Sequence, residues 1–341
     1  MPQSLMAAEI ADIPDAVARL LDRGGPAIRA AARAARALDP PLIATVARGS
    51  SDHACTFLKY AAELVLGLPV ASIGPSVASI YKVSLRLRRA LALAVSQSGE
   101  SPDILALATA ARAGGALTVA ITNHPASPLG QAASHTLALH AGPERSVAAT
   151  KTFVASAVAG LALIAHWKED EDLLFAIAAL PERLARAVAL DWPALREALA
   201  GEESLYVLGR GPSWAMANEA ALKFKEVALI HAESYSSAEV LHGPVSIVDR
   251  GFPVLALTAA DAAEDSVAEV ADRLAGRGGR VFVTSDRARA AQVLPHVRTD
   301  HPLTDPLALI ATFYATVERI AVARGIPPDT PPHLSKVTRT L

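Results

Sequence analysis

Two patterns of apolar residues alternate along the chain: short continuous runs, and longer segments with apolar residues every three or four positions. The first pattern is typical of buried strands, and the second is typical of helices that pack one face against a sheet. In the first half, predicted strands cover residues 42–47, 70–73, 91–95, 117–121 and 136–139. Helical patterns such as 52–66 and 102–113 lie between them. This order predicts a parallel sheet with helices on both faces.

Helical patterns also precede and follow this first set of strands. Residues 8–38 predict two helices joined around Gly24 and Gly25, because glycine weakens a helix interior. A second helical region is predicted from Thr150 to about Ala200, with interruptions at 170–172 and at Pro181.

The alternation restarts after residue 200. Predicted strands cover 205–208, 254–257, 281–283 and a segment near Val297, and predicted helices cover 215–228, 263–275 and 306–324. Residues 46–50 resemble 208–212, and residues 114–119 resemble 278–283, at an offset near 160 positions. The repeat predicts an α/β protein with two tandem, doubly wound, flavodoxin-like parallel sheets in three α/β/α layers. We expect N-terminal helices over 1–39, a first domain over 40–190, a second over 191–325 and a tail over 326–341.

Composition fits two domains of ordinary size, since 52% of the 341 residues are hydrophobic. The net charge of −2 and the scattered arginines give no reason to expect a nucleic-acid partner. The apolar run 153–165 is too short to span a bilayer, and the N-terminus lacks a signal-peptide pattern. We therefore expect a cytoplasmic enzyme with no membrane partner. The single cysteine, Cys55, excludes an intrachain disulfide and is expected to be a buried, inert thiol.

Hydroxyl-rich turns follow two of the predicted strands. Gly49, Ser50 and Ser51 come after the first strand, and residues 96–101 come after the third. A helix N-terminus carries unpaired N–H groups and a partial positive charge, so hydroxyls there suit a phosphate or another anion. Such serines would bind a phosphate without an arginine clamp. The alternative is helix capping alone, because serine is a favoured N-cap residue.

Three other segments place charged side chains where they could do chemistry. Glu219, Lys223 and Glu226 share one face of a predicted helix, although a solvated face would look similar. His242 precedes a Gly-Pro break and could move protons near neutral pH, or serve a structural role. Lys336 follows two prolines in the tail; it lies either in a frayed terminus or near a sugar carbonyl, where it could form an imine.

Together these segments resemble the SIS (sugar isomerase) family, and most of all the tandem isomerase half of glucosamine-6-phosphate synthases. The likeness runs from about residue 40 to Leu341. It rests on several ordered motifs: residues 96–100, 142–144, 149–151, 221–226, 231–233, Glu239 with 242–244, and 334–336.

The resemblance implies a role for each matching residue. The sugar phosphate would be held by Ser50, Ser51, Ser96, Gln97, Ser98 and Ser101. Glu226 would move the proton between C1 and C2, and Lys223 would assist proton transfer at the sugar oxygens. His242 would open the ring, reaching in from the other subunit of a homodimer. Lys336 would form an imine with the open-chain ketose.

The family pattern also implies that Val147, Ala149 and Ser335 border the sugar, with no metal ion and no redox cofactor. Two positions depart from the synthases: Ala149 stands where serine is usual, and Leu241 where lysine is common. A third departure is that only some forty residues precede the first predicted strand, with no glutaminase domain and no nucleophilic cysteine at its start.

The implied reaction is therefore deamination: glucosamine 6-phosphate and water give fructose 6-phosphate and ammonia. Glu226 would serve as the acid–base group if partial burial raised its pKa. Other enzyme possibilities are a deaminase or deglycase of galactosamine 6-phosphate or a fructosamine phosphate, and a ketose–aldose isomerase without ammonia chemistry. A sugar-phosphate sensor is the alternative outside enzymes. The short alanine-rich N-terminal region makes a poor DNA-binding domain, and binding alone needs none of Glu226, His242 and Lys336.

Overall fold

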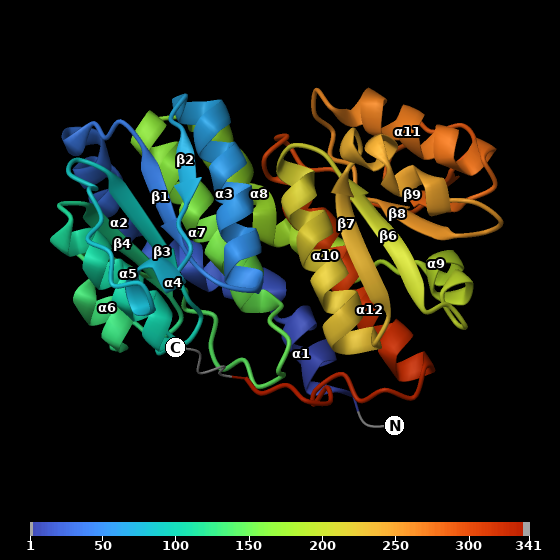
Figure 1. Cartoon of the computed structure of the whole chain (residues 1–341), viewed down its shortest axis with the longest axis horizontal. Helices are drawn as coiled ribbons and strands as arrows, with labels where there is room; N and C mark the ends of the chain where they lie inside the picture. The colour runs from blue at the N-terminus through green and yellow to red at the C-terminus, as the bar shows by residue number, and fades with distance from the viewer. Residues whose placement is uncertain (1–2, 337–341) are drawn as a thin grey trace. The chain divides into compact units, whose positions relative to one another are not determined.

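The computed structural model describes residues 3–336, and the chain folds as two compact units. The first-half unit comprises Asp15–Glu144, Lys151–Ala178 and the tail from Ser335. The second-half unit comprises the start of the chain to Pro14, Arg145–Thr150 and Ala179–Leu334. Each unit contains one five-stranded sheet whose paired strands are all parallel (Figure 1).

The sheet of the first-half unit has the order β2-β1-β3-β4-β5. Its strands are β1 (Ile43–Val46), β2 (Val70–Ser72), β3 (Leu91–Val95), β4 (Leu117–Thr122) and β5 (His135–Ala138). The strand order reverses at β1: β2 is added on one side of β1, and β3 is added on the other side. In doubly wound sheets a ligand crevice lies outside the carboxyl ends of the strands at such a reversal.

Side chains of this sheet alternate between two helix-covered faces. Ala44, Val46, Ala92 and Ala94 point to the face covered by α4 (Ser76–Ser79), α5 (Pro102–Ala113) and α6 (Pro128–Ala132). The intervening positions on β1 and β3 point to the other face, against α3 (Ser50–Leu66) and α7 (Lys151–Lys168). Because both faces are covered, the strands read as continuous apolar runs, as the sequence predicts.

The N-terminal helices differ from the expected pair. The break falls at Asp12, between α1 (Leu5–Ala11) and α2 (Ile13–Leu38), and α2 runs unbroken through Gly24 and Gly25. A Cβ on Gly24 would lie 3.1 Å from the Leu20 side chain and 3.6 Å from the Ala138 carbonyl. Gly24 therefore lets the helix approach β5 closely instead of ending it.

The second-half unit repeats the same topology, with the strand order β10-β9-β8-β6-β7. Its strands are β6 (Ser204–Gly209), β7 (His231–Ser236), β8 (Pro253–Ala256), β9 (Arg280–Val283) and β10 (Gln292–Val293). Helices α10 (Pro212–Ala228) and α12 (Asp305–Ala323) pack against each other, and α10 also packs on β6 and β7 (Figure 1). α11 (Glu264–Gly276) packs on β9. α9 is Pro193–Ala198, and the short 3-10 helices η1 and η2 are Glu239–His242 and Pro244–Ile247.

The repeat extends to local backbone conformation. Gly49 caps α3 with φ 54° and ψ −135°, and Gly211 caps α10 with φ 59° and ψ −136°. The two glycines are the aligned residues of the repeated segments 46–50 and 208–212. The predicted tandem doubly wound architecture is thus confirmed.

Three details of the second half differ from the prediction. β7 is an edge strand of mostly polar residues, so its sequence lacks the apolar run that marks a buried strand. The last strand is β10, four residues before the expected segment near Val297. Pro181 lies inside α8 (Glu171–Val188) and does not interrupt it, because the buried Leu180 and Leu184 hold the helix by packing.

Within residues 3–336, one helix is long and apolar enough to cross a membrane by length and composition. This helix is α12, and 78% of its most apolar window is buried inside the protein. The run 153–165 lies in α7, where nearly every residue is buried. Both are therefore core helices of their units.

Candidate functional site

The two serine turns of the first-half unit lie at the carboxyl ends of neighbouring strands. Ser50 and Ser51 occupy the first turn of α3, directly after the Gly49 cap. Residues 96–101 join β3 to α5, and Ser101 is the N-cap residue of α5. The Ser101 side chain makes no capping hydrogen bond. Capping therefore does not explain Ser101, and its hydroxyl remains at a helix N-terminus where an anion would be favoured.

The turn after β3 is held by its own hydrogen bonds. Ser96 Oγ accepts from the Gly99 N–H at 3.1 Å, and the Gln97 carbonyl accepts from the Asn123 N–H at 3.1 Å. Gly99 has φ 65°, and a Cβ there would lie 2.0 Å from Ser127 Oγ. Glycine is thus required both for the left-handed conformation and for this close approach. The result is a rigid turn whose peptide groups are fixed before any ligand arrives.

An ion pair joins the two serine turns. The Arg48 guanidinium, which precedes Gly49, donates from Nε to the Asp103 carboxylate in the first turn of α5. The Asp103 side chain is fully buried, whereas 46% of the Arg48 side chain is exposed. The sequence interpretation treated the turns as neutral; the structure adds a guanidinium at this edge of the sheet.

In the second-half unit, α10 carries a cluster of charged side chains inside the protein. Lys223 Nζ lies 2.7 Å from Glu226 Oε2 and 3.1 Å from Glu219 Oε1. The side chains of Lys223 and Glu219 are 1% and 0% exposed, and that of Glu226 is 24% exposed. The solvated-face interpretation of this helix is therefore wrong. Of these three side chains, only that of Glu226 retains access to solvent.

The charge state of Lys223 follows from its neighbours. Burial by itself would lower the pKa of Lys223, but the two carboxylates outweigh burial and hold the pKa above its ordinary value of 10.5. The ammonium form thus persists throughout the neutral range. Its stabilising contribution is complete below pH 10.5 and is lost only as the pH rises through the folded-state pKa.

The tail of the chain places Lys336 against a buried carboxylate of the first-half unit. Lys336 Nζ lies 2.8 Å from Glu144 Oε2, and the Glu144 side chain is fully buried. Thr152 fixes this carboxylate from α7, donating from its backbone N–H at 3.1 Å and from Oγ1 at 2.6 Å. Lys336 is therefore held in place, and the frayed-terminus interpretation is wrong for this residue.

The remaining predicted residues lie elsewhere. His242 is exposed at the end of η1, before Gly243 with φ 148°. Val147 is half-buried and its N–H donates to the Asp329 carbonyl at 3.2 Å. Ala149 is half-buried and Ser335 is exposed. Cys55 is buried, as predicted, and burial raises the pKa of its thiol well above the ordinary value.

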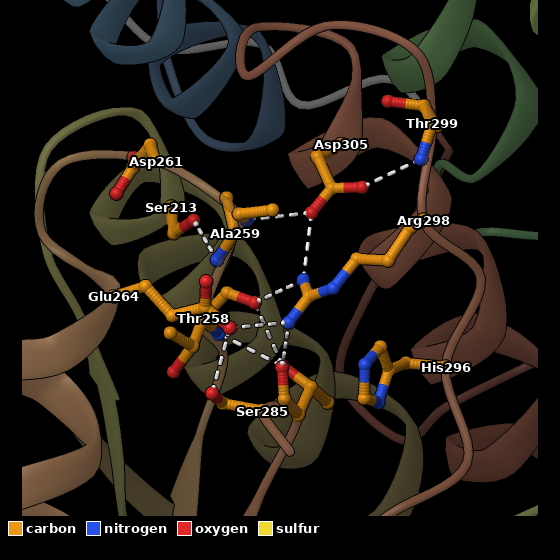
Figure 2. A network of polar contacts seen from close by, with 12 residues as sticks. Ser213, Thr258, Ala259, Asp261, Glu264, Ser285, His296, Arg298, Thr299 and Asp305 are labelled. Carbon is orange, nitrogen blue, oxygen red and sulfur yellow. Dashed lines mark hydrogen bonds and ion pairs between the residues drawn. The ribbon is translucent and has the colours of Figure 1, made fainter. Parts of the chain in front are cut away.

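In the second-half unit, an arginine lies at the sheet edge that corresponds to the serine-turn edge of the first-half unit. Arg298 lies across the ends of β8 and β9, and its guanidinium donates to the carbonyls of Thr258 and Thr284, each at 2.9 Å (Figure 2). Two carboxylates neutralise this guanidinium: Asp305 at 2.7 Å and Glu264 at 2.9 Å. The repeat therefore preserves the topology and the backbone turn, whereas an arginine with two carboxylates occupies this edge in the second-half unit.

Two side chains around Arg298 are anchored in turn. Asp305 begins α12 and accepts from the N–H groups of Thr299 and Ala260, each at 2.8 Å. Glu264 begins α11 and accepts from Ser285 Oγ at 2.7 Å. Arg298 thus ties the starts of α11 and α12 to the sheet (Figure 2), so this network is structural.

Comparison with known proteins gives the family. The SIS domain profile matches residues 39–166 and 198–290, one segment in each half. The chain belongs to the SIS domain family. It is 36% identical over 310 residues to a glutamine–fructose-6-phosphate aminotransferase (isomerizing) from Aeropyrum pernix, covering 85% of this chain and 50% of that protein. The chain thus spans about half the length of the curated relatives it matches.

Solved structures share this SIS fold over the whole chain. A crystal structure from Silicibacter pomeroyi DSS-3, provisionally assigned as a phosphosugar isomerase, is 60% identical with a TM-score of 0.93, covering 96% of this chain and all of that one. A glucosamine-6-phosphate deaminase from Thermotoga maritima has a TM-score of 0.77 at 21% identity, covering 99% and 100% of the two chains. The second likeness shows the fold.

Sequence reasoning missed several partners of the predicted residues. The sequence places Glu144 in a motif but does not show its partner. That partner is Thr152, eight residues later, which donates two hydrogen bonds to the buried Glu144 carboxylate. Arg48 and Asp103 lie 55 positions apart, so no local pattern could pair them. The available signal was an arginine directly before the Gly-Ser turn and an aspartate in the first turn of the next helix.

Proposed function

We propose that the chain is an amino-sugar phosphate deaminase and isomerase that converts glucosamine 6-phosphate and water to fructose 6-phosphate and ammonia. The observation that carries the proposal is the Lys223–Glu226 pair: a partly exposed carboxylate whose partner ammonium is buried and permanently charged. Such a carboxylate can accept and return a proton while its position stays fixed. The serine turns would hold the phosphate group of this substrate.

The reaction can be written with these groups in named roles. His242, contributed by the other subunit of a homodimer, opens the sugar ring and exposes the C1 aldehyde. Glu226 removes the proton from C2 and returns it at C1, which leaves a C2 imine and a C1 alcohol. The Lys223 ammonium, 2.7 Å from Glu226 Oε2, would assist the proton transfer by stabilising the negative charge at this carboxylate. Water then adds to C2, and ammonia leaves.

Lys336 has the partner that imine formation requires. Attack on a ketose carbonyl needs the neutral amine, and the Glu144 carboxylate lies 2.8 Å from Nζ, where it can take up the proton. Loss of water would then give the protonated imine beside a carboxylate that stabilises it. Val147, Ala149 and Ser335 would line the sugar in this scheme.

The 341 residues contain no thiol suited to glutamine hydrolysis. Hydrolysis of glutamine by the synthase route needs a reactive thiolate. Here Cys55 is the single cysteine, it is buried, and burial raises the pKa of its thiol.

A second candidate is ketose–aldose isomerisation without ammonia chemistry. It is favoured by the 60% identity to a chain provisionally assigned as a phosphosugar isomerase. Both reactions share the C1–C2 proton transfer at Glu226, so they differ only in what C2 carries.

The test is an assay of the purified protein with a panel of hexose 6-phosphates and hexosamine 6-phosphates, together with fructosamine 6-phosphate. Ammonia and ketose phosphate are measured in the same samples. The proposal predicts equal amounts of both from glucosamine 6-phosphate. Ketose–aldose conversion of plain hexose phosphates with no ammonia from any amine would select the second candidate. Binding without turnover of any compound would contradict both.

A further inference from the structure

Tyr314 joins the buried charge cluster on α10 from a different helix. Its hydroxyl donates to Glu219 Oε1 at 2.9 Å, the same oxygen that lies 3.1 Å from Lys223 Nζ. Tyr314 is fully buried in α12, the helix that packs along α10 (Figure 1). The ring of Phe313, its neighbour in sequence, packs edge-on against Phe224 of α10 at 5.1 Å. The tyrosine is therefore fixed relative to α10 by packing on both helices.

The contacts form a connected series from Tyr314 through Glu219 and Lys223 to Glu226. Each distance in the series lies between 2.7 and 3.1 Å. A hydrogen bond from a hydroxyl stabilises the ionised form of a carboxylate and limits its rotamers. An anchored Glu219 in turn limits the directions in which the Lys223 ammonium can point. Of the four side chains, only Glu226 is partly exposed, so the series ends at the group that meets substrate.

We propose that Tyr314 is a positioning residue for the proton transfer: through Glu219 and Lys223 it holds the Glu226 carboxylate in its reactive orientation. The proposal rests on the proposed function, because it assumes that Glu226 transfers the proton. Tyr314 hydrogen-bonds Glu219, and the series reaches Glu226 only through Lys223. Removal of the Tyr314 hydroxyl should therefore lower kcat and leave the phosphosugar KM unchanged, since the serine turns hold the phosphate.

The test compares Tyr314→Phe with the wild type and with Tyr206→Phe as a matched control. Both substitutions remove one hydroxyl from a buried tyrosine of the second-half unit, and Tyr206 lies on β6, outside the charge cluster. We expect kcat to fall about tenfold in Tyr314→Phe, the effect of one lost hydrogen bond to a charged group, with KM within about twofold of wild type. Tyr206→Phe should retain the wild-type kcat.

A second variant separates positioning from general destabilisation. If Tyr314 acts through Glu219, the Tyr314→Phe/Glu219→Gln double variant should have the kcat of Glu219→Gln alone, because the hydroxyl no longer has its carboxylate partner. Losses that multiply in the double variant would overturn the proposal. So would a wild-type kcat in Tyr314→Phe, or a fall in kcat that matches the loss of folded protein. Should Tyr314→Phe not fold, a wild-type kcat in Glu219→Gln would overturn it equally.

The outcome distinguishes this inference from the proposed function. The readout includes exchange of a C1 hydrogen of fructose 6-phosphate with solvent, which detects the proton transfer without ammonia. A wild-type protein that shows neither exchange nor ammonia release overturns the proposed function and the positioning role together. An active wild type with a fully active Tyr314→Phe variant overturns the positioning role alone.

Discussion

At the scale of single residues, the surroundings of a few charged groups determine which of them stay charged and which can reach solvent. Lys223 remains an ammonium because two carboxylates outweigh the burial that would lower its pKa. Glu226 shares this ion pair but keeps a solvent-facing surface. The same helix therefore carries one group that only holds charge and another that can exchange a proton.

Replacing Glu226 by glutamine tests the proton-transfer role directly. The amide keeps the shape of the side chain but cannot accept a proton, so kcat for ammonia release should fall by roughly a thousandfold. The dissociation constant for fructose 6-phosphate, measured calorimetrically, should change by less than about threefold. Glu269→Gln, at an exposed position on α11, is the control and should behave as wild type. Ammonia release by Glu226→Gln at the wild-type rate would remove Glu226 from the mechanism.

Trapping with borohydride tests Lys336. Reduction of a protein–fructose 6-phosphate mixture should leave a stable adduct on the tail peptide, because borohydride converts an imine to a secondary amine. Lys336→Ala should give no adduct, and Glu144→Gln should form it more slowly, since the amine loses its proton acceptor at 2.8 Å. Lys225→Ala, which replaces an exposed lysine of α10, should give the wild-type adduct. An undiminished adduct in Lys336→Ala would exclude the imine role.

The local sequence could identify these candidate residues but not their partners. Glu219, Lys223 and Glu226 follow from helical spacing, because positions three and four apart share a face. Burial of that face depends on α12, where Tyr314 lies 95 positions after Glu219. The Lys336–Glu144 pair spans 192 positions. Contacts of this length are set by packing of the whole unit, which a pattern along the chain does not encode.

At the scale of elements, the turn between β3 and α5 carries serines of the proposed phosphate site. Its conformation depends on Gly99, and its serines lie where the strand order of the sheet reverses. The sequence predicted this strand, turn and helix with the observed bounds, because the apolar run, the Ser-Gly cluster and Pro102 are all local signals. It missed β7 because an edge strand of polar residues has no such run.

A substitution at Gly99 should weaken binding of a sugar phosphate. Gly99→Ala adds a Cβ 2.0 Å from Ser127 Oγ at φ 65°, so the turn must shift. We expect the dissociation constant for a hexose 6-phosphate to rise at least about tenfold. Gly67→Ala is the matched control: it has φ 69° at the end of α3 and nothing within 4 Å of the added carbon. It should lose only about 1 kcal/mol of stability and bind normally. Equal binding by both variants would contradict a phosphate seat at this turn.

At the scale of the whole molecule, the two halves contain sheets of one topology with different edges. The first edge presents serines and a partly exposed Arg48, whereas the second is closed by Arg298 with two carboxylates. Sequence comparison of the halves predicted the shared topology. It could not predict the closure, because Arg298 lies outside the repeated segments and reaches the edge only in the folded protein.

The proposed homodimer has a consequence for mixtures of inactive variants. If His242 serves the active site of the other subunit, His242→Ala and Lys336→Ala should complement each other after mixing and subunit exchange. About a quarter of wild-type activity is expected, because random pairing makes half of the dimers mixed and each of these has one intact site. Each variant alone should stay inactive toward the cyclic sugar. No recovery in a sample shown to contain mixed dimers would contradict a shared site.

The central claim is that the serine turns hold a sugar phosphate whose C1 and C2 meet the α10 carboxylate. The most direct measurement is a crystal structure of Glu226→Gln soaked with glucosamine 6-phosphate, since that variant should bind the sugar without consuming it. The account predicts the phosphate against Ser50, Ser98 and Ser101, with C1 and C2 beside Gln at position 226. A sugar phosphate bound at the Arg298 edge, or anywhere remote from Ser98, would contradict it.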